Sequence, residues 1–392
     1  MKRNKKAFAY ILLFNLAFLL VGQRPAISNA SLGGSGFGGL VQSADPEVAR
    51  LIVEAEVKYK NSRLSDSLKS IHNALEQAKL SDKPELSRAF VLVYAGTAYN
   101  NSGLHENAAK SFAEAYDLLV SFRSRVNENP FRVFPLLDEL SKQESETGSF
   151  EEGDRAIGRA QLSALNGLSI AHRALGEYSK PIKYLRATYS PSVAEQFSEV
   201  ELDVVINLGD TYLLADQYSE GIEVFKENID VLDSLGKDSE SGSLSASFYI
   251  QKAVLSNYLA RFHIRSNRLD DGKRFQDEFL KFAEQAMSSA AEENAADIEK
   301  IYFYLLSGLG DSFLSAENYS EAEAIYEQAL AFGSSLLGSH SEVEHQVLEN
   351  ISLINSNLGF LHYQNQDFSK SSEKLDASIQ SLSNLSPVLD DS

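Results

Sequence analysis

One segment of the chain has the spacing of a known chemical motif. Gly34-Ser35-Gly36-Phe37-Gly38-Gly39 fits the letters G-x-G-x-x-G of a dinucleotide-binding loop. Such a loop holds a pyrophosphate only when a strand precedes it and a helix packs directly after it. Here an apolar segment precedes the glycines, and no β-α-β pattern surrounds them. We therefore interpret residues 31–45 as a Gly/Ser-rich tether and expect no cofactor.

Possible metal ligands gather once, between His340 and His345, where Glu342 and Glu344 separate the two imidazoles. Zinc and copper accept imidazole and carboxylate ligands. Residues five apart on a helix point to different faces, however, so these two histidines do not converge. The chain has no cysteine, which excludes thiolate zinc sites, disulfides and thiol catalysis. We predict no resident metal.

Signs of catalysis are equally sparse. No nucleophile elbow, phosphate-binding loop or zinc-protease helix motif occurs. With 55 acidic residues in the chain, no carboxylate pair stands out as an acid–base pair. His172, His263 and His362 are expected to be packing or surface residues. The sequence favours a protein that is not an enzyme. The alternative is an enzyme or ligand-sensing receptor on a helical frame, because catalytic residues converge in space.

The first thirty residues have the order of a secretory signal peptide. Basic residues between Lys2 and Lys6 precede an apolar run from Ala7 to Gly22, and Ser28-Asn29-Ala30 offers small residues at a cleavage site. We predict cleavage near Ala30 and an extracytoplasmic protein, periplasmic or secreted. An N-terminal membrane anchor is the alternative, because the run approaches the length that spans a bilayer.

The acidic balance of the chain limits its partners. The formal charge is −19, and loss of residues 1–30 with their five basic side chains makes it −24. Such a surface repels phosphate backbones and anionic lipid headgroups. We therefore expect no nucleic-acid partner and no membrane insertion of the mature chain. Other proteins or peptides are the expected partners.

The segments that would position a binding site are predicted to be helices. From Pro46 to about residue 385, apolar residues recur at helical spacing in paired segments separated by short polar turns. No strand-length alternation appears, and only eight prolines interrupt the chain. This pattern predicts an all-α fold.

The paired segments repeat one pattern of small and aromatic residues. Two copies read Leu208-Gly209, Tyr212, Tyr218, Gly221, Phe225 and Leu309-Gly310, Phe313, Tyr319, Ala322, Tyr326. Two more read Ala95-Gly96, Tyr99, Gly103, Ala108, Phe112 and Leu358-Gly359, His362, Phe368, Ser371, Leu375. A small residue on the first helix faces a small residue on the second, so the backbones can approach closely while the aromatics fill the adjacent space. One hairpin cannot bury its apolar faces alone, but stacked hairpins can.

This pattern resembles the tetratricopeptide repeat (TPR). The resemblance implies a TPR-like superhelix over residues 46–385, an α-solenoid of about seven to eight antiparallel helix hairpins, with a tail over 386–392. The small residues of the first helices, which we call pivot residues, are Ala55, Gly96, Ser141, Ser169, Gly209, Ala260, Gly310 and Gly359. The last three intervals are near 50 residues rather than the usual ~34, so we expect lengthened C-terminal helices.

The resemblance also implies a concave groove lined by the first helix of each hairpin. Positions one turn apart on these helices would meet the ligand. By register they are Thr97, Asn100, Asn166, Arg173, Asp210, Asn257, Arg261, Asp311, Phe360 and Tyr363. The expected function is that of an exported protein–protein interaction scaffold or adaptor that binds peptide or helical segments in this groove.

Overall fold

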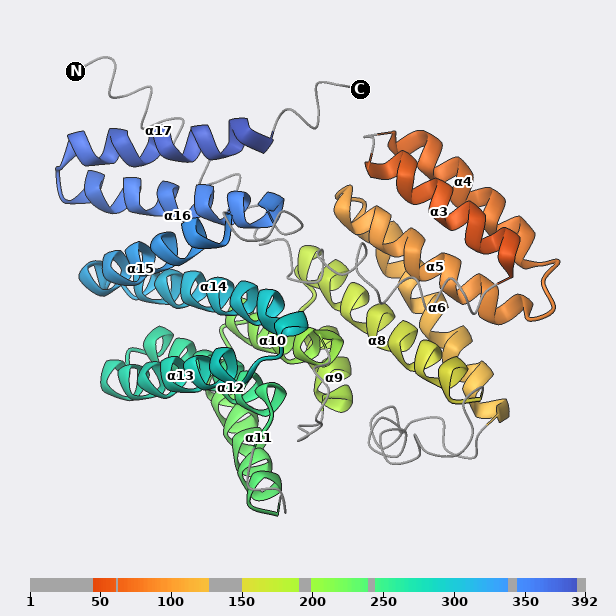
Figure 1. Ribbon diagram of the computed structural model, residues 1–392, viewed down its shortest axis with the longest axis horizontal. Coiled ribbons are helices and arrows are strands. Elements are labelled where there is room, and N and C mark those ends of the chain that lie inside the picture. Colours follow the sequence, from red (N-terminus) through yellow and green to blue (C-terminus); the bar gives the residue numbers. More distant parts are fainter. Residues whose placement is uncertain are drawn as a thin grey trace. The chain divides into compact units, whose positions relative to one another are not determined.

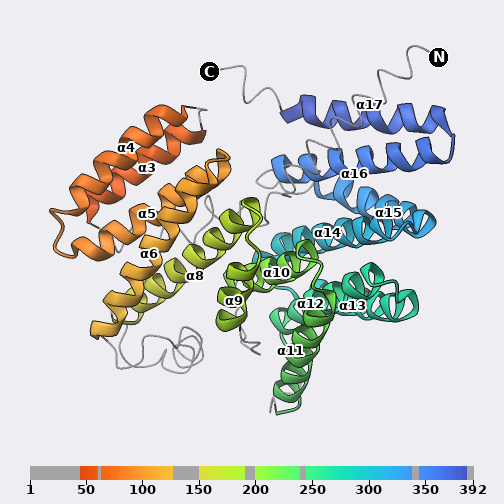
Figure 2. The ribbon, with the colours of Figure 1, turned by 180° about the vertical axis from the view of Figure 1, so that it is seen from behind.

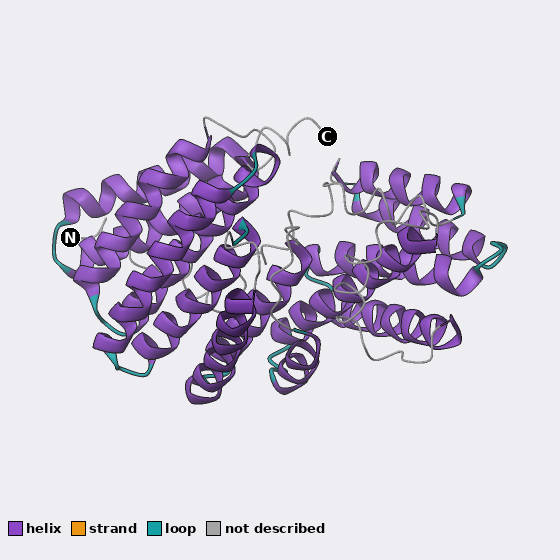
Figure 3. Ribbon diagram, turned by 60° about the horizontal axis from the view of Figure 1, so that its bottom comes forward, coloured by secondary structure: helices purple, strands orange, loops and turns teal. Residues whose placement is uncertain are grey.

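The computed structural model describes residues 45–60, 63–126, 150–189, 199–238, 244–337 and 344–385, and all of its elements are α-helices (Figures 1 and 3). The helices are α3 (Pro46–Lys60), α4 (Leu64–Ala78), α5 (Pro84–Asn101), α6 (His105–Val126), α8 (Phe150–Ala174), α9 (Ser179–Thr188), α10 (Glu199–Leu214), α11 (Tyr218–Asp238), α12 (Ala246–Arg265), α13 (Leu269–Ser289), α14 (Glu292–Ser315), α15 (Tyr319–Leu337), α16 (Glu344–Gln364) and α17 (Phe368–Leu385).

Several of the predicted features lie outside the described residues. These are the signal peptide (1–30), the Gly-rich segment, the pivot at Ser141, the tail (386–392) and the side chains of the His340–His345 cluster. Among the helices that are described, none is long and apolar enough to cross a bilayer.

The helices belong to two compact units. One extends to Ile298 and contains α3–α13, and the other begins at Glu299, within α14, and contains the rest of α14 through α17. Below they are called the N-terminal and the C-terminal unit.

Within each unit, consecutive helices pair as hairpins (Figures 1 and 2). The pairs are α3–α4, α5–α6, α8–α9, α10–α11, α12–α13 and α16–α17, and Tyr326 of α15 packs on Gly310 of α14. Most of the turns between paired helices contain only three residues, from the end of α5 at Asn101 to the start of α6 at His105, for example. Turns this short make the paired helices antiparallel neighbours.

Six of these turns have the same backbone geometry. Each has one residue with positive φ, between 54° and 75°, seven positions after a pivot residue. These residues are Gly103, Gly176, Asp216, Asn267, Glu317 and Gln366. The following residue donates its N–H back to the carbonyl three positions after the pivot, as from Gln217 to Tyr212 at 3.0 Å. This pattern is a Schellman motif that ends the first helix, and it recurs at the register that the sequence predicts.

The close approach of backbones at the pivot is confirmed in two hairpins. Ser67 Oγ donates to the Ala55 carbonyl at 2.7 Å, and Ser371 Oγ donates to the Gly359 carbonyl at 2.8 Å. In both, the donor lies twelve residues after the pivot, on the second helix. A hydroxyl of one helix reaches a backbone carbonyl of the other only where bulky side chains are absent.

At other pivots the small residue makes room for an aromatic ring. A Cβ on Gly209 would lie 2.4 Å from the ring of Tyr258, and one on Gly96 would lie 2.8 Å from that of Phe112. Tyr258 comes from the next hairpin. The prediction that Gly209 chiefly faces Gly221 is therefore incomplete, because the pivot also receives a side chain from its neighbour in the series.

The short interval between the pivots Ser141 and Ser169 indicates either that one of them is misassigned or that helices run together there. Ser141 lies outside the described residues, but the residues near Gly153 that would form its second helix begin α8, which continues through Ser169 to Ala174. These two segments thus run together in one helix of 25 residues. Helices α11–α17 span 18–24 residues, yet α6 and α8 are as long. Lengthening is thus not confined to the C-terminal hairpins.

The second helix of one hairpin packs on the first helix of the next. This occurs at α4–α5, α6–α8, α9–α10, α11–α12 and α15–α16. At α11–α12 the contact is aromatic, because the Phe225 ring lies 5.5 Å from Tyr258 and 5.3 Å from Phe262. These contacts between hairpins, together with those within them, form the core.

Candidate binding site

The predicted partner-binding residues divide by exposure. Asn166, Asn257 and Arg261 are buried, and the side chain of Arg173 is only 7% exposed. Thr97, Asn100, Asp210, Asp311, Phe360 and Tyr363 are half-buried. Only the second group presents substantial surface to a ligand.

Three of the predicted residues come together in what we call the arginine cluster, which consists of Arg173, Asn207, Asp210, Tyr258 and Arg261. They come from α8, α10 and α12 of the N-terminal unit. Arg173 Nη2 donates to Asn207 Oδ1 at 2.7 Å, and Tyr258 donates its hydroxyl hydrogen to Asp210 Oδ1 at 2.7 Å. Asp210 also lies 3.7 Å from the Arg173 guanidinium and 3.5 Å from that of Arg261. The cluster therefore joins the first helices of three successive hairpins.

The cluster has two guanidinium groups and one carboxylate. Burial lowers the pKa of Arg173, and the nearby Asp210 carboxylate acts in the opposite direction but less strongly. Arg261 lies over the Tyr258 ring with its guanidinium carbon 4.6 Å from the ring centre. Asp210 keeps 24% of its side chain exposed, whereas Arg173 keeps 7%. Asp210 is thus the member of this charge pair that solvent or a ligand reaches.

A second cluster occupies the same register in the C-terminal unit. Asp311 follows its pivot Gly310 as Asp210 follows Gly209. Asp311 Oδ1 accepts hydrogen bonds from the Tyr326 hydroxyl at 2.5 Å and from Asn357 Nδ2 at 3.2 Å. Asn357 Nδ2 also lies 3.0 Å from the Tyr326 hydroxyl oxygen. The two tyrosines come from different places, Tyr258 from the next hairpin and Tyr326 from the same one, but each donates to the aspartate after the pivot.

The other predicted residues have separate surroundings. Thr97 Oγ1 donates to the Val93 carbonyl of its own helix, and Asn100 Nδ2 donates across to the Gly167 carbonyl of α8 at 2.9 Å. Asn166 Oδ1 is buried without a hydrogen-bond partner within the described part of the chain. Tyr363 lies edge-on to Phe368 with 5.6 Å between ring centres. The structure therefore gathers some of the ten residues and leaves the rest on separate helices.

Sequence reasoning missed the hydrogen-bonding roles of Asn207, Tyr258, Tyr326 and Asn357. Asn207, Tyr258 and Asn357 each lie two residues before a pivot. At Asn207 and Tyr258 that position faces the preceding hairpin, and the sequence analysis assigned it no role. Tyr326 was predicted as a packing aromatic, and its ring does pack on Gly310. A polar residue two positions before the pivot is the sequence feature that could have indicated these hydrogen bonds between hairpins.

Away from the two clusters, an open depression of about 490 Å³ is lined by Ser65, Leu68, Lys69, His72 and Asn73, all from α4. A single helix does not converge several reactive groups on one point. No group of three or more histidine, aspartate or glutamate side chains suited to a metal ion occurs in the part of the chain that the structure describes.

Neither a scan against protein-family models nor a search of curated proteins found a match to the chain.

Proposed function

We propose that this chain is a TPR-like α-solenoid that serves as an exported scaffold or adaptor and binds peptide or helical segments along its first helices, without catalysing a reaction. The observation that carries the proposal is the recurrence of one turn geometry, seven residues after the pivot in six hairpins. A regular series of hairpins is the architecture that presents extended binding surfaces.

The arginine cluster supports the idea that successive first helices present one continuous face. Arg173, Asp210 and Arg261 lie at related positions on α8, α10 and α12, and their side chains meet. Residues at these positions in neighbouring hairpins are thus close enough to contact one ligand together. A segment laid across the first helices would meet them in turn.

The half-buried members of the predicted set indicate the chemistry of the partner. Asp210 and Asp311 offer carboxylate oxygens, Thr97 and Asn100 offer smaller polar groups, and Phe360 offers apolar area. This mixture suits a peptide that has both apolar side chains and hydrogen-bond donors. Export is proposed from the basic and apolar order of residues 1–30.

The proposal is tested by capturing partners from envelope and secreted fractions on the immobilised protein. Thr97→Arg and Phe360→Arg place a long charged side chain on the proposed face, and Glu227→Arg changes an exposed residue on a second helix as the control. We expect the first two variants to lose a partner that the control retains, with all three unfolding at the temperature of the unaltered protein. A partner retained equally by all variants, or none above background, would overturn the proposal.

Arg261→Glu is a poor test of binding, although its position is on the predicted face. It would bury a second carboxylate beside Asp210 and leave Arg173 as the cluster's only cation. Breaking a buried ion pair typically costs about 3–5 kcal/mol. Lost binding in that variant would therefore report unfolding.

A further inference from the structure

The last described helix, α17, has an apolar stripe that is largely exposed, although Phe368 at its start contacts Tyr363 of α16. Phe368 is 54% exposed, Ile379 is 62% exposed and Leu382 is 38% exposed. They lie at helical spacing on one side of α17, next to the residues Ser371 and Ser378 that bond to α16. Figures 1 and 2 show α17 alongside α16. The side of α17 that bears these residues is called the α17 face.

The equivalent face of an internal hairpin is buried in part, since Ile229 of α11, the counterpart of Ile379, is half-buried. By register from the pivots, Leu382 corresponds to Leu232 of α11, which is fully buried, and Leu375 corresponds to Phe225. The next hairpin covers that face of α11 with Tyr258 and Phe262 of α12. The α17 face is thus the half of a hairpin-to-hairpin contact that would receive another first helix.

The other half of this contact is exposed on α3. Val53 and Val57 are 47% and 53% exposed, and they lie two residues before and two residues after the pivot Ala55. Tyr258 and Phe262 have the same relation to Ala260, and both are buried against the preceding hairpin. The side of α3 that bears the two valines is called the α3 face.

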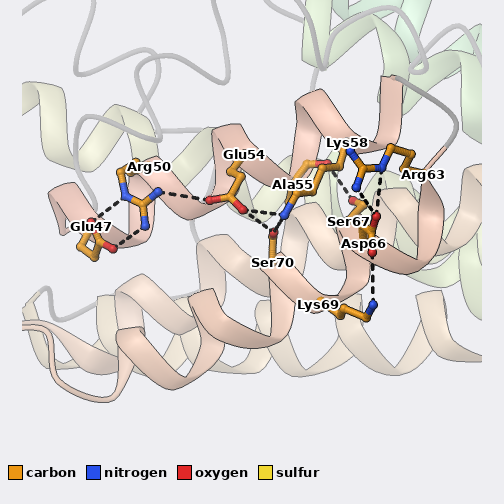
Figure 4. A network of polar contacts seen from close by, with 10 residues as sticks. All are labelled: Glu47, Arg50, Glu54, Ala55, Lys58, Arg63, Asp66, Ser67, Lys69 and Ser70. Carbon is orange, nitrogen blue, oxygen red and sulfur yellow. Dashed lines mark hydrogen bonds and ion pairs between the residues drawn. The ribbon is translucent and has the colours of Figure 1, made fainter. Parts of the chain in front are cut away.

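The register of the first hairpin rests on a direct contact. Ser67 of α4 donates to the Ala55 carbonyl, as Ser371 does to that of the pivot Gly359 (Figure 4). The position two before the pivot faces a preceding second helix in another hairpin as well, because a Cβ on Gly167 would lie 2.1 Å from Phe112 of α6. Val53 therefore occupies a position that internal hairpins use for stacking.

We propose that the α17 face of one copy packs on the α3 face of a second copy, so that the chain self-associates head to tail. Both surfaces of the recurring hairpin-to-hairpin contact are present on one chain, in matching register, and both are exposed. On the rim of the α3 face, Arg50 pairs with Glu47 and Glu54, so charge there is largely balanced within the helix (Figure 4). Because the two faces differ, each copy keeps one free and further copies can add.

The test compares the purified full chain with two double variants by sedimentation velocity over a range of concentrations. Val53→Glu/Val57→Glu disables the α3 face, and Ile379→Glu/Leu382→Glu disables the α17 face. Each variant alone is expected to associate more than about tenfold more weakly than the unaltered protein, because an unpaired carboxylate is costly to bury. Mixed together, they should form a pair that does not grow further, because each still has the face that the other lacks.

The control is Val231→Glu, which changes a valine of similar exposure, 45%, on the internal helix α11. It should associate like the unaltered protein, and circular dichroism should show equal helix content in all variants. A chain that stays monomeric at high concentration would overturn the proposal. Continued self-association of the Val53→Glu/Val57→Glu variant would also overturn it, because that result would mean a symmetric contact between two α17 faces. Loss of association in the control would overturn it as well.

Discussion

Replacing Gly209 by alanine tests how the hairpins fit together. A Cβ at this position would lie 2.4 Å from the Tyr258 ring, which is 1% exposed. The ring cannot move away freely, because its hydroxyl is bonded to Asp210 and its other side lies against Phe225. Movement of the ring would therefore strain two contacts together.

The magnitude follows from three contributions. Overpacking of this kind costs about 1–3 kcal/mol, and loss of the hydrogen bond to a carboxylate costs about 1.5 kcal/mol or more. The helix gains about 1 kcal/mol when alanine replaces glycine in its interior. We expect Gly209→Ala to lower the free energy of unfolding by about 2–3 kcal/mol, and the longer Gly209→Leu to lower it further.

Gly158→Ala provides the matched control. Gly158 also lies within a helix, α8, but nothing lies within 4 Å of where its Cβ would be. This variant should be more stable by about 0.5–1 kcal/mol. Urea unfolding followed by circular dichroism gives the comparison, and amide exchange in α10–α13 shows whether the loss is local, since hairpin arrays can open in parts.

A direct check uses the same substitution with the ring removed. In a Tyr258→Ala background, Gly209→Ala should no longer destabilise, because the alanine methyl then has space. If Gly209→Ala changed stability by less than about 0.5 kcal/mol in the unaltered protein, the assigned contact between pivot and neighbouring hairpin would be wrong.

Three further predictions concern single side chains. Asp210→Asn should destabilise by about 3 kcal/mol or more because it removes the carboxylate beside the guanidinium groups of Arg173 and Arg261. Asp311→Asn, which weakens the hydrogen bonds from Tyr326 and Asn357, should cost about 1–2 kcal/mol. Urea midpoints of equal value would refute this difference. His263 is buried against Phe275, and burial lowers its pKa from 6.5 to about 4, with Arg268 adding to the effect and Asp271 opposing it. The unfolded chain therefore binds the proton at higher pH than the folded chain does. The contribution of His263 to the free energy of unfolding is full above pH 6.5 and falls toward pH 4, by up to about 3 kcal/mol. His263→Phe should remove this part of the pH dependence, and an unchanged slope of unfolding free energy against pH would contradict the prediction. Gly103→Ala should cost about 1 kcal/mol in thermal unfolding although no atom is near, because the backbone there has φ of 72°; a neutral result would mean that the turn relaxes.

The helices and their register could be predicted because both depend on local spacing. Small and aromatic residues such as Gly310 and Phe313 recur at fixed offsets, and these offsets coincide with the observed turns. The spacing alone left the continuity of α8 open, because small residues such as Gly153 and Ala160 look alike at a helix crossing and inside a continuous helix.

The candidate site was only partly accessible to the same reasoning. The positions of Arg173, Asp210 and Arg261 could be placed on one face, since one-turn spacing defines a face. Their surroundings include Tyr258 and Asn207, which lie two residues before a pivot and to which the sequence pattern assigned no role. Contacts between hairpins depend on how far the helices slide past each other, and no single segment of the sequence encodes that distance.

The left-handed turn residues have a consequence for the order of folding. Only the turns of α5–α6 and α8–α9 have glycine at this position, whereas Asp216, Asn267, Glu317 and Gln366 adopt the same geometry with a side chain. A side chain there costs about 1–2 kcal/mol at Glu317 and Gln366 and less at Asp216 and Asn267, because Asp and Asn adopt this conformation more readily. The turns without glycine therefore close less readily in isolation. Folding of the N-terminal unit is therefore expected to begin around Gly103 and Gly176 and to spread outward. The C-terminal unit has no glycine among its turns at Glu317 and Gln366, so we expect its hairpins to close together, each stabilised by the other's surface.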